Sequence, residues 1–237
     1  MNIIITGTGF SFPDGTGAAA RVMSFAKGLM QHGATVHVFC PKPTENENTG
    51  SRNLHLKGVY QGITFEYTCG QRLVAKTRVC ALLLYLKGLW HACRAIWRIH
   101  RETPVDAILL WYAELPINFL VFSALAKSIS AVLIAEKSEL PFVYCNKTAA
   151  LRTNMWFYEH VTCRLLDGVI VISTFLEDYF TARLRKTAKL LRVPILVETD
   201  LFTVDTEIAE RMDSKIIYCG NLGHDGEVPE LLRPLAK

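Results

Sequence analysis

Residues 2–39 read NIIITGTGFSFPDGTGAAARVMSFAKGLMQHGATVHVF, and this stretch decides the fold. Its β-branched run Ile3–Ile5 predicts a strand that is buried on both faces. Apolar residues then recur three and four apart over 19–30, which predicts a helix, and Gly33 is typical of the position just after a helix. A second strand is predicted at 35–39. Strand, glycine loop, helix and strand form a βαβ unit, with the loop at the carboxyl edge of a sheet.

The loop between the first strand and the helix is suited to holding a phosphate. Glycines in Gly15-Thr16-Gly17 let a ligand approach the backbone, and the N–H groups at a helix start attract negative charge. The alternative is that these glycines only permit a tight turn. A dinucleotide-binding domain would carry an acid at the end of the second strand, but Phe39-Cys40-Pro41-Lys42 has none. A free-standing nucleotide-binding domain is therefore the weakest candidate. Tight binding of NAD by the protein would support it.

The rest of the chain repeats the alternation of strands and helices. Its 237 residues are half apolar, enough for one large α/β domain or for one domain and part of another. Strands are predicted at 62–67, 105–111, 130–135, 168–172, 190–197 and 215–219, and helices at 79–101, 115–127 and 148–166. Apolar strands separated by helices predict an α/β fold with a doubly wound, mostly parallel, Rossmann-like sheet. Such sheets bind ligands at the carboxyl ends of their strands.

The last part of the sequence predicts the start of a second βα domain. A strand at 215–219, a glycine turn and a helix beginning at Pro229 follow a polar stretch. We therefore predict an amino-terminal domain at 1–205, then a linker and the first βα unit of an incomplete domain at 206–237. The seven scattered cysteines and the absence of a signal peptide favour a reduced, cytoplasmic chain. No metal site is expected, and the net charge of +4 without a nucleic-acid motif argues against a nucleic-acid partner.

Four motifs occur in order along the chain, namely PDGTG at 13–17, LDGVIVIS at 166–173, VPILVE at 193–198 and IIYCGNL at 216–222. Together they resemble the amino-terminal half of a GT-B fold glycosyltransferase of family 4, which contains many retaining hexosyltransferases. The acidic pair of that family's carboxyl-terminal domain is missing from this sequence. The resemblance thus implies the acceptor-binding half and one wall of the donor diphosphate site. We expect little or no transferase activity from the 237-residue chain alone.

The resemblance also implies which residues contact substrates. Gly15, Thr16 and Gly17 would contact the diphosphate of a sugar nucleotide, the co-substrate, with no other cofactor. The acceptor, a glycan or lipid-linked sugar, would lie near residues that follow two predicted strands: Tyr112, Glu114, Glu136, Ser138 and Glu139. Glu136 and Glu139 are the candidate catalytic residues, because a carboxylate can accept the proton of a sugar hydroxyl. A solvated loop without chemistry is the alternative, and retaining transfer requires no strong base.

The predicted helix at 79–101 belongs to a segment, 72–101, that contains no acid. At helical spacing, one face carries Lys87, Arg94, Arg98 and Arg101; the opposite face carries Val79, Leu82, Leu86, Leu89, Cys93 and Ile96; and Trp90 and Trp97 lie at the boundary. This pattern fits a helix lying on an anionic membrane. It equally fits a helix docked on the sheet with its basic face in water. The first interpretation predicts a peripheral protein on the inner face of the membrane.

Two roles for the chain remain open at this stage. The first is the acceptor half of a sugar-nucleotide-dependent hexosyltransferase in polysaccharide or glycolipid assembly. The second is a non-catalytic membrane-docking or acceptor-presenting subunit that works with a separate donor-binding chain, or a truncated inactive remnant. A neighbouring reading frame that carries the acidic pair would favour a split enzyme.

Overall fold

The computed structural model describes residues 1–46, 52–111, 116–140 and 149–196. Contacts along the chain divide it into two units, Met1–Val197 and Glu198–Lys237. The second unit lies outside the described residues, and so do the strand predicted at 215–219 and the helix predicted to begin at Pro229. The domain boundary at residue 205 therefore stays a prediction.

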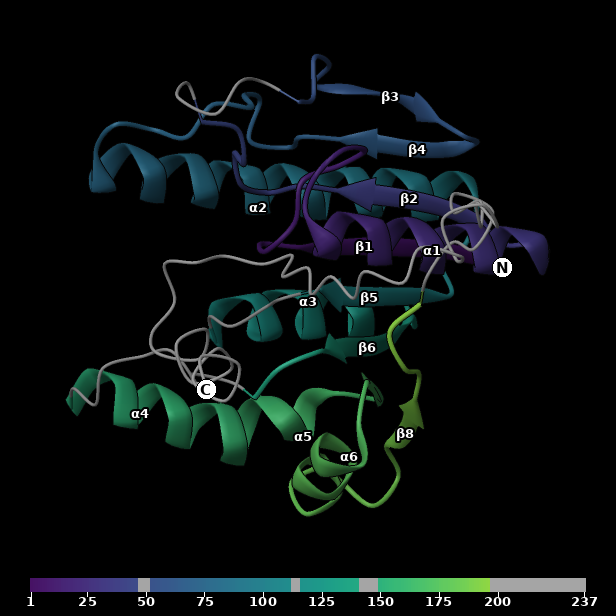
Figure 1. The fold of residues 1–237 in the computed structure, drawn as a ribbon, viewed down its shortest axis with the longest axis vertical. Helices are drawn as coiled ribbons and strands as arrows, with labels where there is room; N and C mark the ends of the chain where they lie inside the picture. Colours follow the sequence, from purple (N-terminus) through teal and green to yellow (C-terminus); the bar gives the residue numbers. More distant parts are fainter. Residues whose placement is uncertain (47–51, 112–115, 141–148, 197–237) are drawn as a thin grey trace, which may run out of the picture. The chain divides into compact units, whose positions relative to one another are not determined.

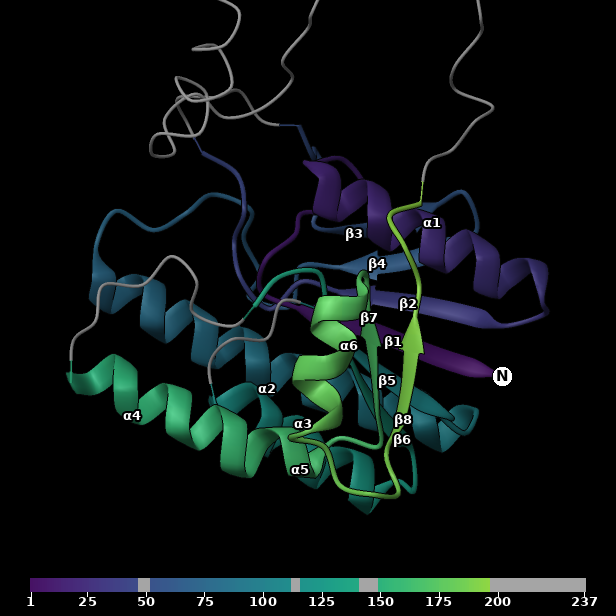
Figure 2. The same cartoon turned by 60° about the horizontal axis from the view of Figure 1, so that its bottom comes forward.

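A sheet of eight strands runs through the described part of the first unit, in the order β3-β4-β2-β1-β5-β6-β7-β8 (Figure 1). The strands are β1 (Asn2–Gly7), β2 (Thr35–Phe39), β3 (Lys57–Tyr60), β4 (Ile63–Glu66), β5 (Ala107–Trp111), β6 (Val132–Lys137), β7 (Gly168–Val171) and β8 (Lys189–Arg192). All adjacent pairs are parallel except β3 and β4, which form an antiparallel hairpin. Figure 2 shows β7 and β8 side by side, as their parallel pairing requires. The predicted doubly wound, mostly parallel sheet is confirmed.

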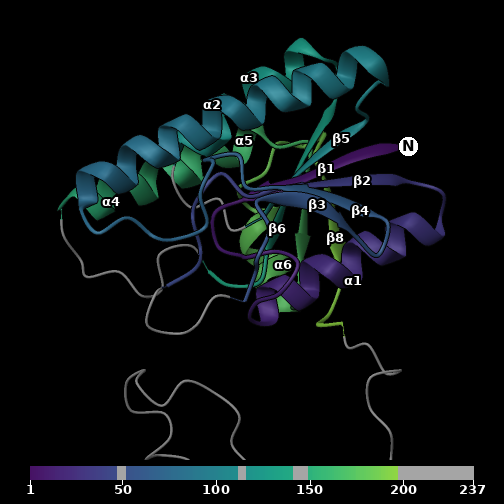
Figure 3. The same cartoon turned by 90° about the horizontal axis from the view of Figure 1, so that it is seen from above.

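Helices cover both faces of this sheet, with α1 and α2 on opposite sides (Figure 3). The helical elements are α1 (Gly17–Gln31), α2 (Arg78–Glu102), α3 (Pro116–Ser128), α4 (Ala149–Phe157), the π-helical turn η2 (Tyr158–Thr162), α5 (Cys163–Leu165) and α6 (Thr174–Thr181). One apolar core lies between the sheet and α2, α3 and α6, and a second lies between the sheet and α1. The central strands β1 and β5 are buried along their whole length, which explains their near-continuous apolar sequences.

Three local predictions need correction. No strand was predicted at β3, whose sequence KGVY is short and largely exposed. The strand predicted at 190–197 ends at Arg192, because the proline at 194 has no N–H for a ladder. The helix predicted at 148–166 is interrupted by the π-helical turn η2.

Candidate functional site

The two halves of the sheet meet between β1 and β5, where the strand order reverses. Gly7, the last residue of β1, pairs with Trp111, the last residue of β5. A Cβ atom on Gly7 would lie 1.6 Å from the Trp111 carbonyl oxygen, so only glycine allows the strands to approach this closely. Thr8 continues the ladder by donating its N–H to the same oxygen at 3.3 Å. In open α/β sheets this switch point is the usual place for a ligand.

The loop after β1 leads to an open helix start at the switch point. Thr16 is the N-cap of α1, but its side chain makes no capping hydrogen bond, and no acidic residue occupies the first turn. Thr16 and Gly17 are exposed, and a Cβ atom on Gly17 would meet nothing within 4 Å. One on Gly15 would lie 2.7 Å from the Cβ of Ala19, so Gly15 is needed for packing. The helix start thus offers backbone N–H groups and positive dipole charge to an anion.

Buried polar side chains from distant segments hold this loop in place. Asn53 accepts a hydrogen bond from the Asp14 N–H at 2.9 Å and donates to the Asp14 carbonyl at 2.8 Å. Asn53 also donates to the Glu45 carboxylate at 2.6 Å. The Tyr67 hydroxyl accepts from the Phe12 N–H at 3.1 Å, and burial raises the pKa of Tyr67 to about 12, so the hydroxyl keeps its proton. Sequence reasoning missed Asn53, Tyr67 and Glu45, because Asn53 and Tyr67 act on residues 39 and 55 positions away and Glu45 acts through Asn53.

Glu136 lies on the side of the sheet that α1 covers, where it contacts Arg21 of that helix. It was predicted in the loop after a strand, but the structure places it inside β6, with 1% of its surface exposed. Its Oε1 accepts hydrogen bonds from Arg21 Nε at 2.9 Å and from Ser138 Oγ at 2.6 Å. Burial raises the pKa of Glu136, although Ser138 and Arg21 oppose that shift. The carboxylate is therefore placed to hold Arg21, not to face an acceptor in solvent.

Arg21 connects three parts of the fold. Besides its ion pair with Glu136, its Nη1 and Nη2 donate to the carbonyls of Pro194 and Val193 at 2.9 and 3.0 Å. Its guanidinium also lies over the ring of Phe25, 5.1 Å from the centroid. The amino-terminal part of α1 is thus joined, through its fifth residue, to β6 and to the segment that leaves β8.

The other predicted substrate contacts have mixed positions. Glu139 is exposed and Ser138 is half-buried, both just after β6. Tyr112 and Glu114 directly follow β5 but lie outside the described residues. Trp111, which precedes them at the end of β5, is fully buried in the core.

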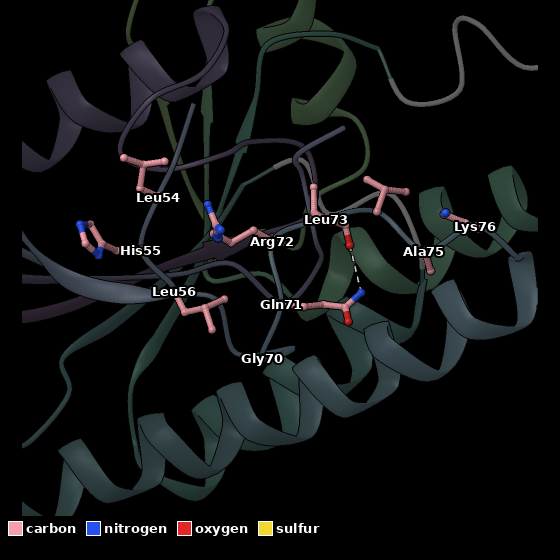
Figure 4. A pocket seen from close by; sticks show the side chains of 10 residues that line it. Leu54, His55, Leu56, Gly70, Gln71, Arg72, Leu73, Ala75 and Lys76 are labelled. Carbon is pink, nitrogen blue, oxygen red and sulfur yellow. Dashed lines mark hydrogen bonds between the residues drawn. The ribbon is translucent and has the colours of Figure 1, made fainter. Parts of the chain in front are cut away.

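A cavity of about 570 Å³ lies close to the loop network, between the segment after Asn53 and the segment after β4 (Figure 4). Its lining is Leu54, His55, Leu56, Gly70, Gln71, Arg72, Leu73, Val74, Ala75 and Lys76. The walls are mainly aliphatic, while Arg72 and Lys76 add positive charge. Arg72 also donates a hydrogen bond to the Asn53 carbonyl, which joins the cavity wall to the loop network. A ligand with both apolar and anionic parts suits this lining.

The protein-family comparison matches residues 16–195 to a model described as a glycosyl transferase 4-like domain. The matched segment is well over half of the chain and contains the open start of α1, Arg21, Glu136 and the cavity. The chain belongs to the glycosyl transferase 4-like family. A search of the curated proteins returned no match.

Solved structures with the same fold extend this assignment. Sucrose-phosphate synthase from Thermosynechococcus elongatus matches with a TM-score of 0.62 and 15% identity, over 87% of this chain and 51% of that one. The apo UGT2 of Phytolacca americana matches with a TM-score of 0.54 and 10% identity, over 90% of this chain and 55% of that one. This glycosyl transferase 4-like chain therefore has the fold of the amino-terminal half of a GT-B glycosyltransferase. It spans about half the length of these two structures.

The expectation that no metal is needed stays a prediction for this family member. Among the described residues, no group of three or more histidine, cysteine, aspartate or glutamate side chains is placed to hold a metal ion.

Proposed function

We propose that this chain is the acceptor-side half of a retaining glycosyltransferase that moves a hexose from a sugar nucleotide to a glycan or lipid-linked acceptor. The observation that carries the proposal is the open, uncapped start of α1 at the sheet's switch point. Backbone N–H groups of Gly15 to Gly17 form one wall for the donor diphosphate. Asn53 holds the neighbouring Asp14 by hydrogen bonds, and Arg21 ties α1 to Glu136 of β6.

The acceptor occupies the same edge of the sheet. The cavity at 54–56 and 70–76 takes its apolar or anionic part, and the exposed Glu139 with Ser138 contacts sugar hydroxyls. Tyr112 and Glu114, the other predicted acceptor contacts, follow β5 in the sequence and lie outside the described residues. Glu139 is the stronger candidate for the catalytic carboxylate, because it is exposed, whereas Glu136 is buried and its Oε1 already accepts from Arg21 and Ser138. No metal ion takes part.

The donor wall can be tested with uridine, guanosine and adenosine diphosphates as probes in binding titrations. The 237-residue chain should bind one of them weakly, with a Kd near the millimolar range, because only one wall is present. Gly17→Leu should weaken binding at least tenfold while the fold is kept, since open space surrounds this position. Gly28→Leu is the matched control, because its Cβ also meets nothing within 4 Å on the same helix. Equal binding by both variants would contradict the donor wall.

A non-catalytic, membrane-docking or acceptor-presenting subunit is the second candidate, favoured by the exposed tryptophans of α2, Trp90 and Trp97. Both candidates predict no sugar transfer by the purified chain. The two candidates are distinguished by adding the protein encoded by a neighbouring reading frame to the purified chain and measuring sugar transfer. Restored transfer in the mixture supports a split enzyme, whereas transfer by the lone chain contradicts the proposed half-enzyme.

A further inference from the structure

The side of α2 that faces away from the sheet carries a ridge of large apolar side chains. Its members are 42–68% exposed: Val79, Leu82, Leu83, Leu86, Trp90 and Trp97. The helix docks on the sheet through other residues, including Leu89 and Ile96, which belong to the core. This corrects the sequence prediction, which placed Val79, Leu82 and Leu86 on one face with Leu89 and Ile96. Soluble monomers rarely leave such a continuous apolar surface uncovered.

Positive charge lies along one flank of this ridge. At about 100° per residue, the exposed Lys87, Arg94, Arg98 and Arg101 follow the same edge of the helix. None of these four makes an ion pair within the described part of the chain. No acidic residue occurs in the helix before Glu102, its last residue. An occupant of the ridge must therefore be apolar at its centre and anionic beside it.

The apolar surface continues past the amino-terminal end of α2. Leu73 and Val74 are 39% and 47% exposed and line the cavity together with Leu54, which is 72% exposed. Figure 4 shows Gly70, in the wall of this cavity, directly above a helix. A Cβ atom on Gly70 would lie 3.4 Å from the Lys87 Nζ of α2, so the cavity and the basic flank are neighbours.

A helix with these properties does not cross a bilayer in this fold. By length and composition alone, α2 is apolar enough to span one. However, Leu89, Ala92 and Ile96 pack into the core between α2, α3 and the sheet. Spanning would pull these side chains out of the core. A helix that stays packed on its own protein along one side, and exposes the other side, can contact a membrane only by lying along the membrane surface.

We propose that the exposed face of α2 docks this protein on an anionic membrane surface. The ridge enters the boundary between headgroups and acyl chains, and Trp90 and Trp97 lie at headgroup level, where indole rings are favoured. The basic flank faces lipid phosphates. Docking itself does not depend on the proposed transferase activity. If the proposed function also holds, docking brings the cavity next to the lipid surface from which a lipid-linked acceptor would come.

The test is sedimentation with vesicles of phosphatidylcholine containing 30% phosphatidylglycerol, against phosphatidylcholine alone (composition chosen so that anionic charge dominates). The protein should bind the anionic vesicles at least tenfold more tightly, and higher salt should weaken binding. Trp90→Gln with Trp97→Gln should reduce binding at least tenfold. Trp156→Gln with Phe175→Gln is the matched control, because these aromatic side chains are 58% and 63% exposed on other helices. Far-UV circular dichroism checks that each variant is folded.

The contribution of positive charge is tested with Arg94→Gln combined with Arg98→Gln. This variant should lose the preference for anionic over neutral vesicles. Equal binding to neutral and anionic vesicles, no binding at all, or unchanged binding by the Trp90 and Trp97 variant would overturn the proposal. Sedimentation velocity provides one more outcome. If the protein self-associates and the Trp90 and Trp97 substitutions abolish this without any vesicle binding, the ridge is an interface between copies and the membrane proposal is wrong.

Discussion

Arg21 and Glu136 form a buried ion pair whose two members are 7% and 1% exposed. Buried pairs rarely add much net stability, but removing one member leaves an uncompensated charge and is expensive. Here the pair also positions the amino-terminal part of α1, since Arg21 bonds to Glu136 and to carbonyls beyond β8. The pair acts as a positioning device under the candidate donor wall, and it predicts a specific dependence on pH.

Arg21→Met should destabilise the protein more at pH 8 than at pH 5. Burial raises the pKa of Glu136 above the ordinary pKa of a glutamate. At pH values between the unfolded-state and folded-state pKa, folding therefore takes up a proton. The stability that this carboxyl contributes falls as the pH rises through that range. Arg21 lowers the pKa of Glu136, so its removal raises that pKa further and extends the pH range over which stability is lost. We expect a cost of about 3–5 kcal/mol at pH 8 by urea unfolding. Arg164→Met, at an exposed position, should cost under about 0.5 kcal/mol at both pH values.

A second variant separates charge from packing at this pair. Adding Glu136→Gln to Arg21→Met should recover part of the lost stability at pH 8, because no buried charge then remains. A double variant that is as unstable as the single one would contradict the role given to the ion pair.

The Tyr67 hydroxyl shares a hydrogen bond with Thr44 Oγ1 at 3.1 Å, and it is expected to stabilise the glycine loop by accepting the Phe12 N–H. Tyr67→Phe leaves the Phe12 N–H without its acceptor and should cost about 1–3 kcal/mol in urea unfolding. Tyr60→Phe, on the exposed strand β3, is the control and should change stability by less than about 0.5 kcal/mol. Similar values for the two variants would mean that the loop does not depend on this contact.

At the scale of elements, α2 marks the limit of periodicity as a guide. Apolar residues surround much of this helix, so the pattern predicts its extent well: 79–101 was expected and Arg78–Glu102 is found. The pattern could not tell which apolar side docks on the sheet. That choice is set by how closely α2 approaches the backbone at Pro41. A Cβ atom on Gly88 would lie 2.0 Å from the Pro41 carbonyl oxygen. The Gly88 side of the helix is therefore the one that can dock.

The helices also differ in how they present their cysteines. Cys80, in the first turn of α2, is exposed, whereas Cys163 at the start of α5 is buried and burial raises the pKa of its thiol to about 12. Iodoacetamide at pH 8 should therefore modify Cys80 roughly 100-fold faster than Cys163, as read from peptide masses. In urea the two rates should converge. Fast modification of Cys163 in the folded protein would contradict its burial.

At the scale of the whole molecule, the alternation of apolar strands and helices was enough to predict the doubly wound sheet. The candidate site was predicted only in part. The glycines of the loop are neighbours in sequence and could be found, but Arg21, Asn53 and Tyr67 act across 115, 39 and 55 residues. No local pattern marks such partners. Glu136 was found by its position near a strand end, but its ion pair could not be foreseen.

The junction of the two sheet halves is the most sensitive point of the fold. Gly7→Ala should cost about 3 kcal/mol or more, because its Cβ would overlap the Trp111 carbonyl and push β1 from β5. Gly28→Ala places the same atom in open space inside α1 and should stabilise by up to about 1 kcal/mol. Thermal unfolding of both variants measures the contrast. A tolerated Gly7→Ala would mean that the strands can separate without loss of the sheet.

The two outermost strands of the described sheet, β3 and β8, have a consequence for colloidal behaviour. Each is only four residues long, and each begins with a lysine, while β8 also ends with an arginine. Short borders with cationic side chains are poor templates for adding a strand from another molecule. The protein should thus resist amyloid-like stacking through its sheet, even at high concentration.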